Sequence, residues 1–309
     1  MAVFFKRARL WQGLAPLLLG LCTLAAAEPL RVCVSEDSPP QSNVHKGQAT
    51  GFDIRLAQAV ADAAGRELQI VPFESEFEKE STLAHEVNAL LSSGQCDLVS
   101  GFPLLRSDLG PASRPSARVP DHPGAKRKRD RPYIPLGELV ASAPYQASTL
   151  GVVQSPQQGP VNTLMDLKDR KTGAVTGTLA GTLVSVYRQG ALRSQMVTLS
   201  QRENAWTALE NGRIDSLMLP TAAYDAYKLK HADTPLVLAA LRRPIGLNLG
   251  FVTLASAPQE LLAVTNQVIA QALTDGRMQQ WARQEGLSWT PPTQPAVSTG
   301  PSLHSLTTD

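Results

Sequence analysis

The chain has 309 residues, 43% apolar and 18% charged, which is long enough for an α/β protein of two lobes. Its 29 basic and 27 acidic side chains nearly balance, and three of the basic residues lie within the first 27 positions. Without that segment the ratio is 26 to 27, a net charge of −1, so bulk charge gives no reason to expect binding to nucleic acid or to an anionic membrane.

Residues 1–27 have the pattern of a signal peptide for the Sec route. Three basic residues precede an apolar stretch over 14–24, and three alanines stand directly before Glu28. The stretch is too short to span a bilayer, and no later segment reaches the roughly 18 apolar residues that a spanning helix needs. We therefore expect cleavage and export to the periplasm, with a retained N-terminal anchor as the alternative.

The next part of the chain predicts the order strand, helix, strand, helix, strand. Apolar residues recur with the period of a strand or of a helix, and glycine or proline ends each run. This order implies a parallel sheet with helices on both faces. The expected strands are 30–34, 68–73 and 98–99, and the expected helices are 53–64 and 82–91.

Residues 107–131 interrupt this rhythm. Four prolines alternate with arginines and with the basic run 126–129, and no apolar period is present. This composition predicts a mobile surface loop. The basic run suits a polyanion or an acidic protein partner, although a solvated loop is the simpler interpretation.

A second lobe is expected to begin near Ala141. After its last strand, Pro258 opens a long helix and Trp281 lies in a short final one. Residues 289–309 are rich in proline, serine and threonine, which predicts a disordered tail. The expected strands are 173–178, 216–219 and 247–254, and the expected helices of this lobe are 182–188, 205–210 and 221–230.

Two cysteines follow the leader, Cys33 in the first predicted strand and Cys96 at the start of a later one. An exported protein can oxidise such a pair. Neighbouring strands would bring the two close, but their positions along the strands are offset. The pattern favours two buried thiols over a disulfide and leaves both possibilities open.

A short unit occurs twice, at 89–99 and at 208–218. In each copy a helix ends on an Ala-Leu pair, a glycine provides the left-handed stop, and Asp97 or Asp215 opens an apolar strand. Chance similarity is the alternative explanation. If the copies are related, they predict two lobes built alike, with a cleft between them where small ligands bind.

Several motifs follow one another in order over residues 28–288, and the most specific is Gly51-Phe52-Asp53 with Leu56-Ala57. The ordered set resembles the periplasmic solute-binding proteins of family 3, the amino-acid type of ABC transporter. This resemblance implies the type II periplasmic binding protein-like α/β fold, with two doubly wound lobes, a two-strand hinge and a ligand that favours the closed form. Lobe 1 would be 28–139 plus 245–288, and lobe 2 would be 140–244.

A second resemblance is closer in detail. The segment Cys96-Asp97-Leu98-Val99 with Gly101 and Pro103, and the turn over 177–182, are similar to the quinoprotein-dehydrogenase-associated branch of this family. Members of that branch are periplasmic partners of alcohol dehydrogenases. The insertion at 107–131 does not match the branch.

The chain also departs from the amino-acid binders at ligand positions. Gln41 stands where those proteins stack an aromatic ring on the ligand, and Leu219-Pro220-Thr221 occupies the region of their ammonium-binding aspartate. Arg106 is the best candidate for their carboxylate-binding arginine but comes about two residues too early. These departures favour an ordinary α-amino acid less than the resemblance alone implies.

The candidate ligand-binding residues suit a small acidic ligand held from both lobes. Arg106 offers a planar fork for a carboxylate or phosphate, and Gly177-Thr178 precedes a helix whose free N–H groups attract anions. A surface salt bridge and a plain helix cap are the alternative roles for these residues. The full set is Asp37, Phe73, Ser100, Phe102, Arg106, Gly177 and Thr178.

Patterns for catalysis are poor. His85-Glu86 lacks the second histidine of a zinc protease, and neither a Gly-x-Ser-x-Gly elbow nor a phosphate-binding loop is present. We expect a monomeric, non-enzymatic periplasmic protein, without cofactor or metal, that captures a small polar or anionic solute for an ABC transporter permease. The alternative is an accessory partner of a periplasmic quinoprotein (methanol-type) dehydrogenase.

Overall fold

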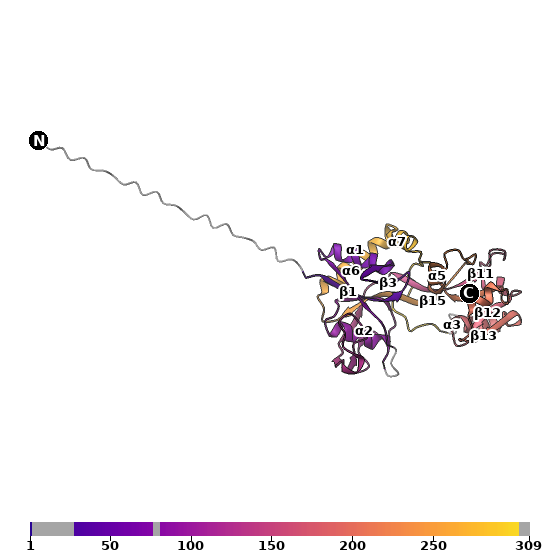
Figure 1. The fold of residues 1–309 in the computed structure, drawn as a ribbon, viewed down its shortest axis with the longest axis horizontal. Coiled ribbons are helices and arrows are strands. Elements are labelled where there is room, and N and C mark those ends of the chain that lie inside the picture. Colours follow the sequence, from indigo (N-terminus) through magenta and orange to yellow (C-terminus); the bar gives the residue numbers. More distant parts are fainter. Residues whose placement is uncertain (2–27, 77–80, 303–309) are drawn as a thin grey trace.

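The computed structural model describes residues 1, 28–76 and 81–302, and it shows two lobes side by side (Figure 1). The predicted signal peptide lies outside the described residues apart from Met1. Within the described ranges, no helix combines the length and the apolar character that crossing a bilayer requires.

The first lobe is a parallel sheet covered by helices on both faces. Alternate residues of the central strand point to opposite sides, so Leu30 and Val32 pack with α1, α6 and α7, while Cys33 packs with α2. The strands are β1 (Leu30–Ser35), β5 (Leu68–Phe73) and β6 (Leu98–Pro103), and the helices are α1 (Phe52–Ala63), α2 (Leu83–Ser92), α6 (Gln259–Thr274) and α7 (Arg277–Glu285).

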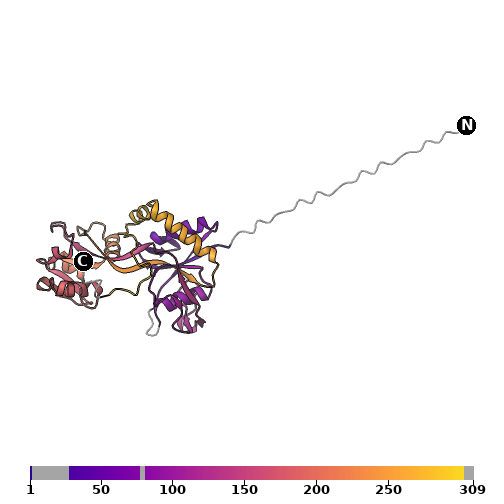
Figure 2. The ribbon, with the colours of Figure 1, turned by 180° about the vertical axis from the view of Figure 1, so that it is seen from behind.

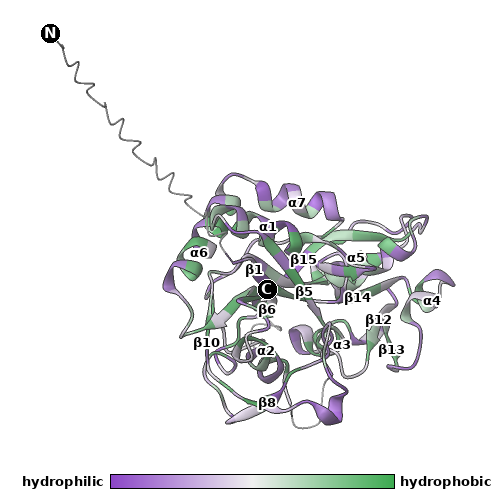
Figure 3. Cartoon of the chain, turned by 60° about the vertical axis from the view of Figure 1, so that its left-hand side comes forward, coloured by the Kyte–Doolittle hydropathy of each residue, from purple (hydrophilic) through white to green (hydrophobic). Residues whose placement is uncertain are grey.

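The second lobe repeats this plan on a smaller scale. Its strand β12 pairs in parallel with β13 and β14, and apolar clusters lie on both faces of these strands. The elements are β12 (Thr172–Val175), β13 (Met196–Leu199), β14 (Ser216–Pro220), α3 (Leu179–Val186), α4 (Ala205–Glu210) and α5 (Thr221–Lys230). The predicted α/β class is confirmed, and the colours of Figure 3 show apolar strands inside and a mainly hydrophilic α7 outside.

Two long strands cross between the lobes, β11 (Gln146–Gln154) and β15 (Val237–Leu254) (Figures 1 and 2). The two strands pair with each other in antiparallel fashion. On its other side β11 pairs with β14 of the second lobe, and β15 pairs with β6 of the first lobe, both also antiparallel. Both lobes therefore share one sheet with the strand order β13-β12-β14-β11-β15-β6-β1-β5. The lobe boundaries at 139/140 and 244/245 stay a prediction.

Short strands and 3-10 helices connect the main elements of the two lobes. The first lobe carries a small antiparallel sheet of β2, β3 and β4 beside the cavity described below. The bounds are β2 (Asp37–Ser38), β3 (Ser42–His45), β4 (Gln48–Thr50), β7 (Gly110–Pro111), β8 (Ser116–Arg118), β9 (Tyr133–Pro135), β10 (Glu138–Ala141), η1 (Lys128–Asp130), η2 (Leu164–Leu167), η3 (Tyr187–Gln189) and η4 (Arg193–Gln195).

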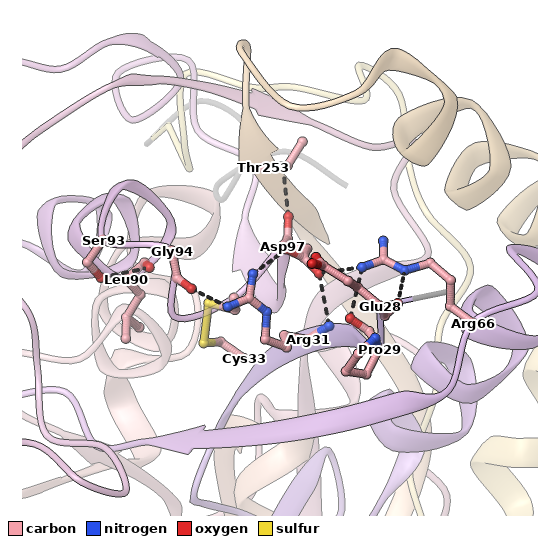
Figure 4. Close-up of polar contacts among 11 residues, drawn as sticks. Glu28, Pro29, Arg31, Cys33, Arg66, Leu90, Ser93, Gly94, Asp97 and Thr253 are labelled. Carbon is pink, nitrogen blue, oxygen red and sulfur yellow. Dashed lines mark hydrogen bonds and ion pairs between the residues drawn. A yellow bond between two sulfur atoms is a disulfide. The ribbon is translucent and has the colours of Figure 1, made fainter. Parts of the chain in front are cut away.

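The repeated unit has the same geometry in both lobes. Asp97 donates its N–H to the carbonyl of Arg31 and accepts the N–H of Arg31 on its carboxylate, at 2.8 and 3.0 Å. Asp215 makes the same exchange with Lys171, at 2.8 and 2.9 Å. In the first lobe, the guanidinium groups of Arg31 and Arg66 also bind the Asp97 carboxylate, and Thr253 donates to its carbonyl (Figure 4). Each aspartate thus fastens the start of a neighbouring strand.

Cys33 and Cys96 form a disulfide, with their Cα atoms 5.7 Å apart. The sequence favoured two buried thiols, and this expectation is wrong. Strand β1 pairs with β6, and Cys96 stands in the turn just before β6, on the side of the sheet where Cys33 points. The two cysteines were expected to be too far apart along their strands. The turn between α2 and β6 brings Cys96 close to β1, so the two sulfur atoms can bond.

The segment 107–131 is not the structureless loop that its composition predicts. It contains β7, β8 and η1, and β8 pairs with β9. The buried guanidinium of Arg131 holds the segment in place. It donates to the carboxylates of Glu76 and Asp121, and to the backbone carbonyls of Lys126 and Val119. A segment that is held by hydrogen bonds and ion pairs of one side chain needs no regular spacing of apolar residues. The order of this segment therefore could not be predicted from such spacing.

The predicted disordered tail is likewise packed over residues 289–302, and 303–309 lie outside the described residues. The side-chain amide of Asn248, on β15, donates to the carbonyls of Thr293 and Ala296 and accepts the N–H of Thr293. Leu105 and Ser298 form an isolated parallel bridge. The tail is held by hydrogen bonds to its backbone, which a proline-rich composition does not reveal.

Candidate functional site

A cavity of about 1400 Å³ is lined by residues of both lobes. The first lobe contributes the segment 35–45 and the ends of β5 and β6, and the second contributes the starts of α3 and α5. The crossing strands β11 and β15 also reach it. Pockets for small ligands usually measure about 300–1000 Å³, so the size fits two lobes that stand apart around a smaller solute.

The Gly51-Phe52-Asp53 motif docks the start of α1 against the wall of this cavity. Gly51 has a φ of 121°, and a β-carbon there would lie 2.6 Å from the carbonyl oxygen of Gln41. The N–H groups of Phe52 and Asp53 donate to the carbonyls of Pro40 and Gln41. Only glycine allows this close approach, which places the side chains of Gln41 and Asp53 together.

Asp53 is 1% exposed and lies at the wall of the cavity. Its Oδ1 atom accepts hydrogen bonds from Gln41 Nε2 at 2.6 Å and from the hydroxyl of Tyr145 at 3.0 Å. Burial raises the pKa of this carboxyl to about 6, although the hydroxyl of Ser100 and the two donors lower it. Gln41 also donates to Gln146 on β11, which links Asp53 to a crossing strand.

Ser100, in β6, carries an unpaired hydroxyl at the same place. The residue is 6% exposed, and its Oγ atom is buried without a hydrogen-bond partner of good geometry, although it is close enough to Asp53 to lower the pKa of that carboxyl. A buried hydroxyl without a partner is unfavourable by roughly 1–3 kcal/mol. A ligand group that bonds Ser100 would recover this energy.

The charge of the lining is mainly negative. It includes four carboxylates and a single lysine, and no arginine is among the described residues that line the cavity. Three of the carboxylates are exposed at the cavity wall. The charged lining residues are Glu36, Asp37, Asp53, Glu74 and Lys230.

Five of the seven residues predicted to bind ligand line the cavity, namely Asp37, Phe73, Ser100, Phe102 and Thr178. Gly177 and Arg106 are not among its lining residues. The structure thus brings residues from both lobes together as expected, and their contribution to binding stays a prediction.

The position of Arg106 differs from the expectation of an anion clamp. Its side chain is exposed, and its N–H donates to the carbonyl of Ser298 in the C-terminal segment. That segment forms a bridge with Leu105, directly before Arg106. Arg106 was the main residue expected to bind an anionic solute, so that expectation has less support.

Thr178 acts as a helix cap. Its hydroxyl donates to the carbonyl of Val175 at 2.8 Å and accepts the N–H of Gly181 at 3.0 Å, so its side chain is already engaged. The N-terminus of α3 still faces the cavity through Leu179 and Ala180.

Several cavity residues were not predicted as ligand-binding residues. Asp53 could have been found, because it lies within the most specific motif of the chain. Gln146 and Lys230 gave no sequence signal, since only the crossing of β11 and the placement of α5 bring them to the cavity. The positions where the chain departs from amino-acid binders do face the ligand space, because Gln41, Pro220 and Thr221 all line it.

No cluster of three or more His, Cys, Asp or Glu side chains suited to a metal ion occurs in the part of the chain that the structure describes.

Residues 30–102 match the sequence model of the bacterial extracellular solute-binding proteins, family 3. This match includes β1, the Gly51-Phe52-Asp53 motif, the first copy of the repeated unit and Ser100. No curated protein sequence matches the chain.

Solved structures establish the fold as the type II periplasmic binding protein-like fold. Substrate binding domain 2 of Lactococcus lactis GlnP, in its open conformation, is similar over 83% of this chain and 94% of that chain, with 17% identity and a TM-score of 0.58. The L-cystine solute receptor of Neisseria gonorrhoeae, unliganded and open, is similar over 84% and 92%, with 17% identity and a TM-score of 0.55. An ancestral cyclohexadienyl dehydratase is similar over 84% and 92%, with 18% identity and a TM-score of 0.56.

Proposed function

We propose that this protein is a periplasmic solute-binding protein that captures a small polar solute between its lobes and presents it to an ABC transporter permease. The observation that carries the proposal is the cavity of about 1400 Å³, to which both lobes contribute polar groups and in which the Ser100 hydroxyl has no hydrogen-bond partner of good geometry. The partial match to a solute-binding family supports the same function.

The two crossing strands suggest how capture would work. Because β11 and β15 join the lobes, a solute that touches both lobes would favour the closed arrangement by its extra contacts there. Gln41 and Gln146 already connect the cavity wall to β11, so they are placed to respond to the solute.

An anionic solute is no longer favoured. The lining carries four carboxylates against one lysine, and Arg106 is not among the lining residues. Bringing a further anion into this site would add repulsion and a desolvation cost. A neutral or cationic solute fits the lining better.

The proposal is tested by thermal unfolding of the purified protein with a panel of polar metabolites, followed by calorimetry on any that stabilise it. Ala223→Trp would fill the cavity, because Ala223 is an exposed lining residue of α5. Ala63→Trp is the matched control, on the exposed surface of α1. We expect the first variant alone to lose binding. A panel with no stabilising member, or equal binding by both variants, would contradict the proposal.

We propose no catalytic role, but one similar structure is named a dehydratase. A buried carboxyl with a raised pKa is also a group that a proton-transfer enzyme uses. Turnover assays on cyclic acids with the purified protein distinguish the two, and product formation that the Asp53→Asn variant abolishes would establish an enzyme.

A role as accessory to a periplasmic quinoprotein dehydrogenase is the second candidate. The observation that favours it is an exposed basic run at 126–129, together with Tyr133, which is 60% exposed and lies under the guanidinium of Arg118. Exposed aromatic and arginine side chains are enriched in protein interfaces. Stable co-purification with a dehydrogenase, together with no response to metabolites, would favour this role over solute capture.

A further inference from the structure

We infer that the captured solute is a small organic cation without a carboxylate group, such as a diamine or agmatine. This inference rests on the proposed function and names the class of solute for the same cavity. It follows from three features of the lining. The first is a carboxylate oxygen and a hydroxyl that can both accept hydrogen bonds from the solute. The second is the negative charge of the surrounding residues, and the third is the absence of a group suited to hold a carboxylate.

The first feature is the pairing of Asp53 with Ser100. Both hydrogen bonds to the Asp53 carboxylate, from Gln41 and Tyr145, go to Oδ1. Its Oδ2 lies beside Gly101, where a β-carbon would be 3.1 Å away, and the neighbouring Ser100 hydroxyl has no partner. The Ser100 hydroxyl lies close enough to this carboxylate to lower its pKa, and its oxygen, like Oδ2, can still accept a hydrogen bond from an ammonium or a guanidinium.

The charge of Asp53 is also uncompensated. Within the described chain the groups that lower its pKa are the neutral amide of Gln41, the neutral phenol of Tyr145 and the neutral hydroxyl of Ser100, and no cation contributes. A buried carboxylate usually has a cationic partner. A cationic solute would supply that partner at the site where the protein does not.

The second feature is the acidic surroundings. Glu36, Asp37 and Glu74 are exposed and line the same cavity, on the first lobe, whereas Lys230 is exposed at the far end of α5 on the second lobe. Clefts lined by one sign of charge concentrate ligands of the opposite sign. The apolar side chains of Phe73, Phe102 and Leu179 are available for the methylene groups of an alkyl amine.

The third feature is that nothing in the lining is suited to clamp a carboxylate. Arginine is absent from the described lining residues, and the Thr178 hydroxyl is engaged in capping α3. An amino acid would bring its carboxylate into a space with four carboxylates already present. The same molecule without that group avoids the repulsion.

Calorimetry on matched ligand pairs tests the inference. Agmatine and arginine differ only by the carboxylate, and so do putrescine and ornithine. We expect agmatine and putrescine to bind at least about ten-fold more tightly than their amino-acid counterparts.

Two variants locate the charge that matters. Asp53→Asn keeps the Oδ1 acceptor and removes the buried charge, and we expect it to weaken agmatine binding by about ten-fold or more. Asp62→Asn, at an exposed position of the same helix, is the matched control and should change affinity by less than about two-fold. Glu74→Gln, at an exposed lining position, should also weaken agmatine binding, which tests the acidic surroundings independently of Asp53.

Arginine that binds as tightly as agmatine would overturn the inference while leaving solute capture intact. Unchanged agmatine affinity in Asp53→Asn would also overturn it. If no ligand of any charge binds, the proposed function itself fails.

Discussion

Asp53→Asn should make this protein more stable at neutral pH. The side chain is 1% exposed, and Oδ1 accepts from Gln41 and Tyr145. Asparagine has nearly the same shape and keeps that acceptor, and its new amide can donate to the unpaired hydroxyl of Ser100. The substitution therefore removes the buried charge and little else.

The magnitude follows from the pKa. Burial raises the pKa of Asp53 to about 6, from an ordinary value near 4 in the unfolded chain. A difference of roughly two pH units corresponds to about 3 kcal/mol. Because the folded-state pKa is the higher one, ionisation destabilises the fold: the loss begins as pH rises above about 4 and is complete above about 6. Asp53→Asn should then gain about 3 kcal/mol at pH 8 and almost nothing at pH 4.

Urea unfolding of both proteins at pH 4, 6 and 8 measures this difference. The gain should grow with pH between the first and last values. A variant that is less stable than the wild type at pH 8, or a difference that does not depend on pH, would refute the reasoning.

The remaining predictions concern anchors of the first lobe. Replacing Cys33 and Cys96 by alanine should lower the free energy of unfolding by about 4 kcal/mol, because the bridge closes a loop with a sequence separation of 63. Asp97→Ala should lower it by about 2 kcal/mol, because two arginines and the start of β1 lose their acceptor. Arg131→Met should lower it by about 3 kcal/mol, because the buried guanidinium holds two carboxylates. Urea unfolding measures all three.

Matched controls separate these effects from general damage. Lys126→Met removes an exposed cation from the same segment as Arg131 and should change stability by less than about 0.5 kcal/mol. For the disulfide, the wild type in reductant should unfold like the alanine pair, and an unchanged transition in reductant would contradict the prediction. For Asp97, equal stability of the wild type and the variant would show that the exchange with Arg31 is dispensable.

Much of the fold could be predicted from local patterns. Helices α1, α2, α4 and α5 begin and end close to the expected residues, because apolar period, caps and glycine stops are properties of a few neighbouring residues. The repeat around Asp97 and Asp215 was visible for the same reason, and the structure gives both copies the same exchange of hydrogen bonds.

The candidate site was predicted only in part. Phe73 and Phe102 lie at or near the ends of β5 and β6, so strand patterns placed them at the edge where a cleft would lie, whereas Ser100 lies within β6 and was singled out by the family resemblance. Arg106 was expected there because of its position in the sequence, but it is not among the lining residues, and its backbone pairs with the C-terminal segment at Ser298. Such pairing between distant segments leaves no local pattern.

The amino-acid order thus determined the main helices, several strands of each lobe and the likeness of the two copies of the repeated unit, since these depend on contacts within a few residues, whereas β11, β13 and the first part of β15 were not predicted. Only the tertiary structure decided that Cys33 meets Cys96, that β11 and β15 cross between the lobes, and that four carboxylates share one cavity. These features depend on which distant segments pack together. The sign of the charge that the site presents to a solute is therefore a property of the folded chain.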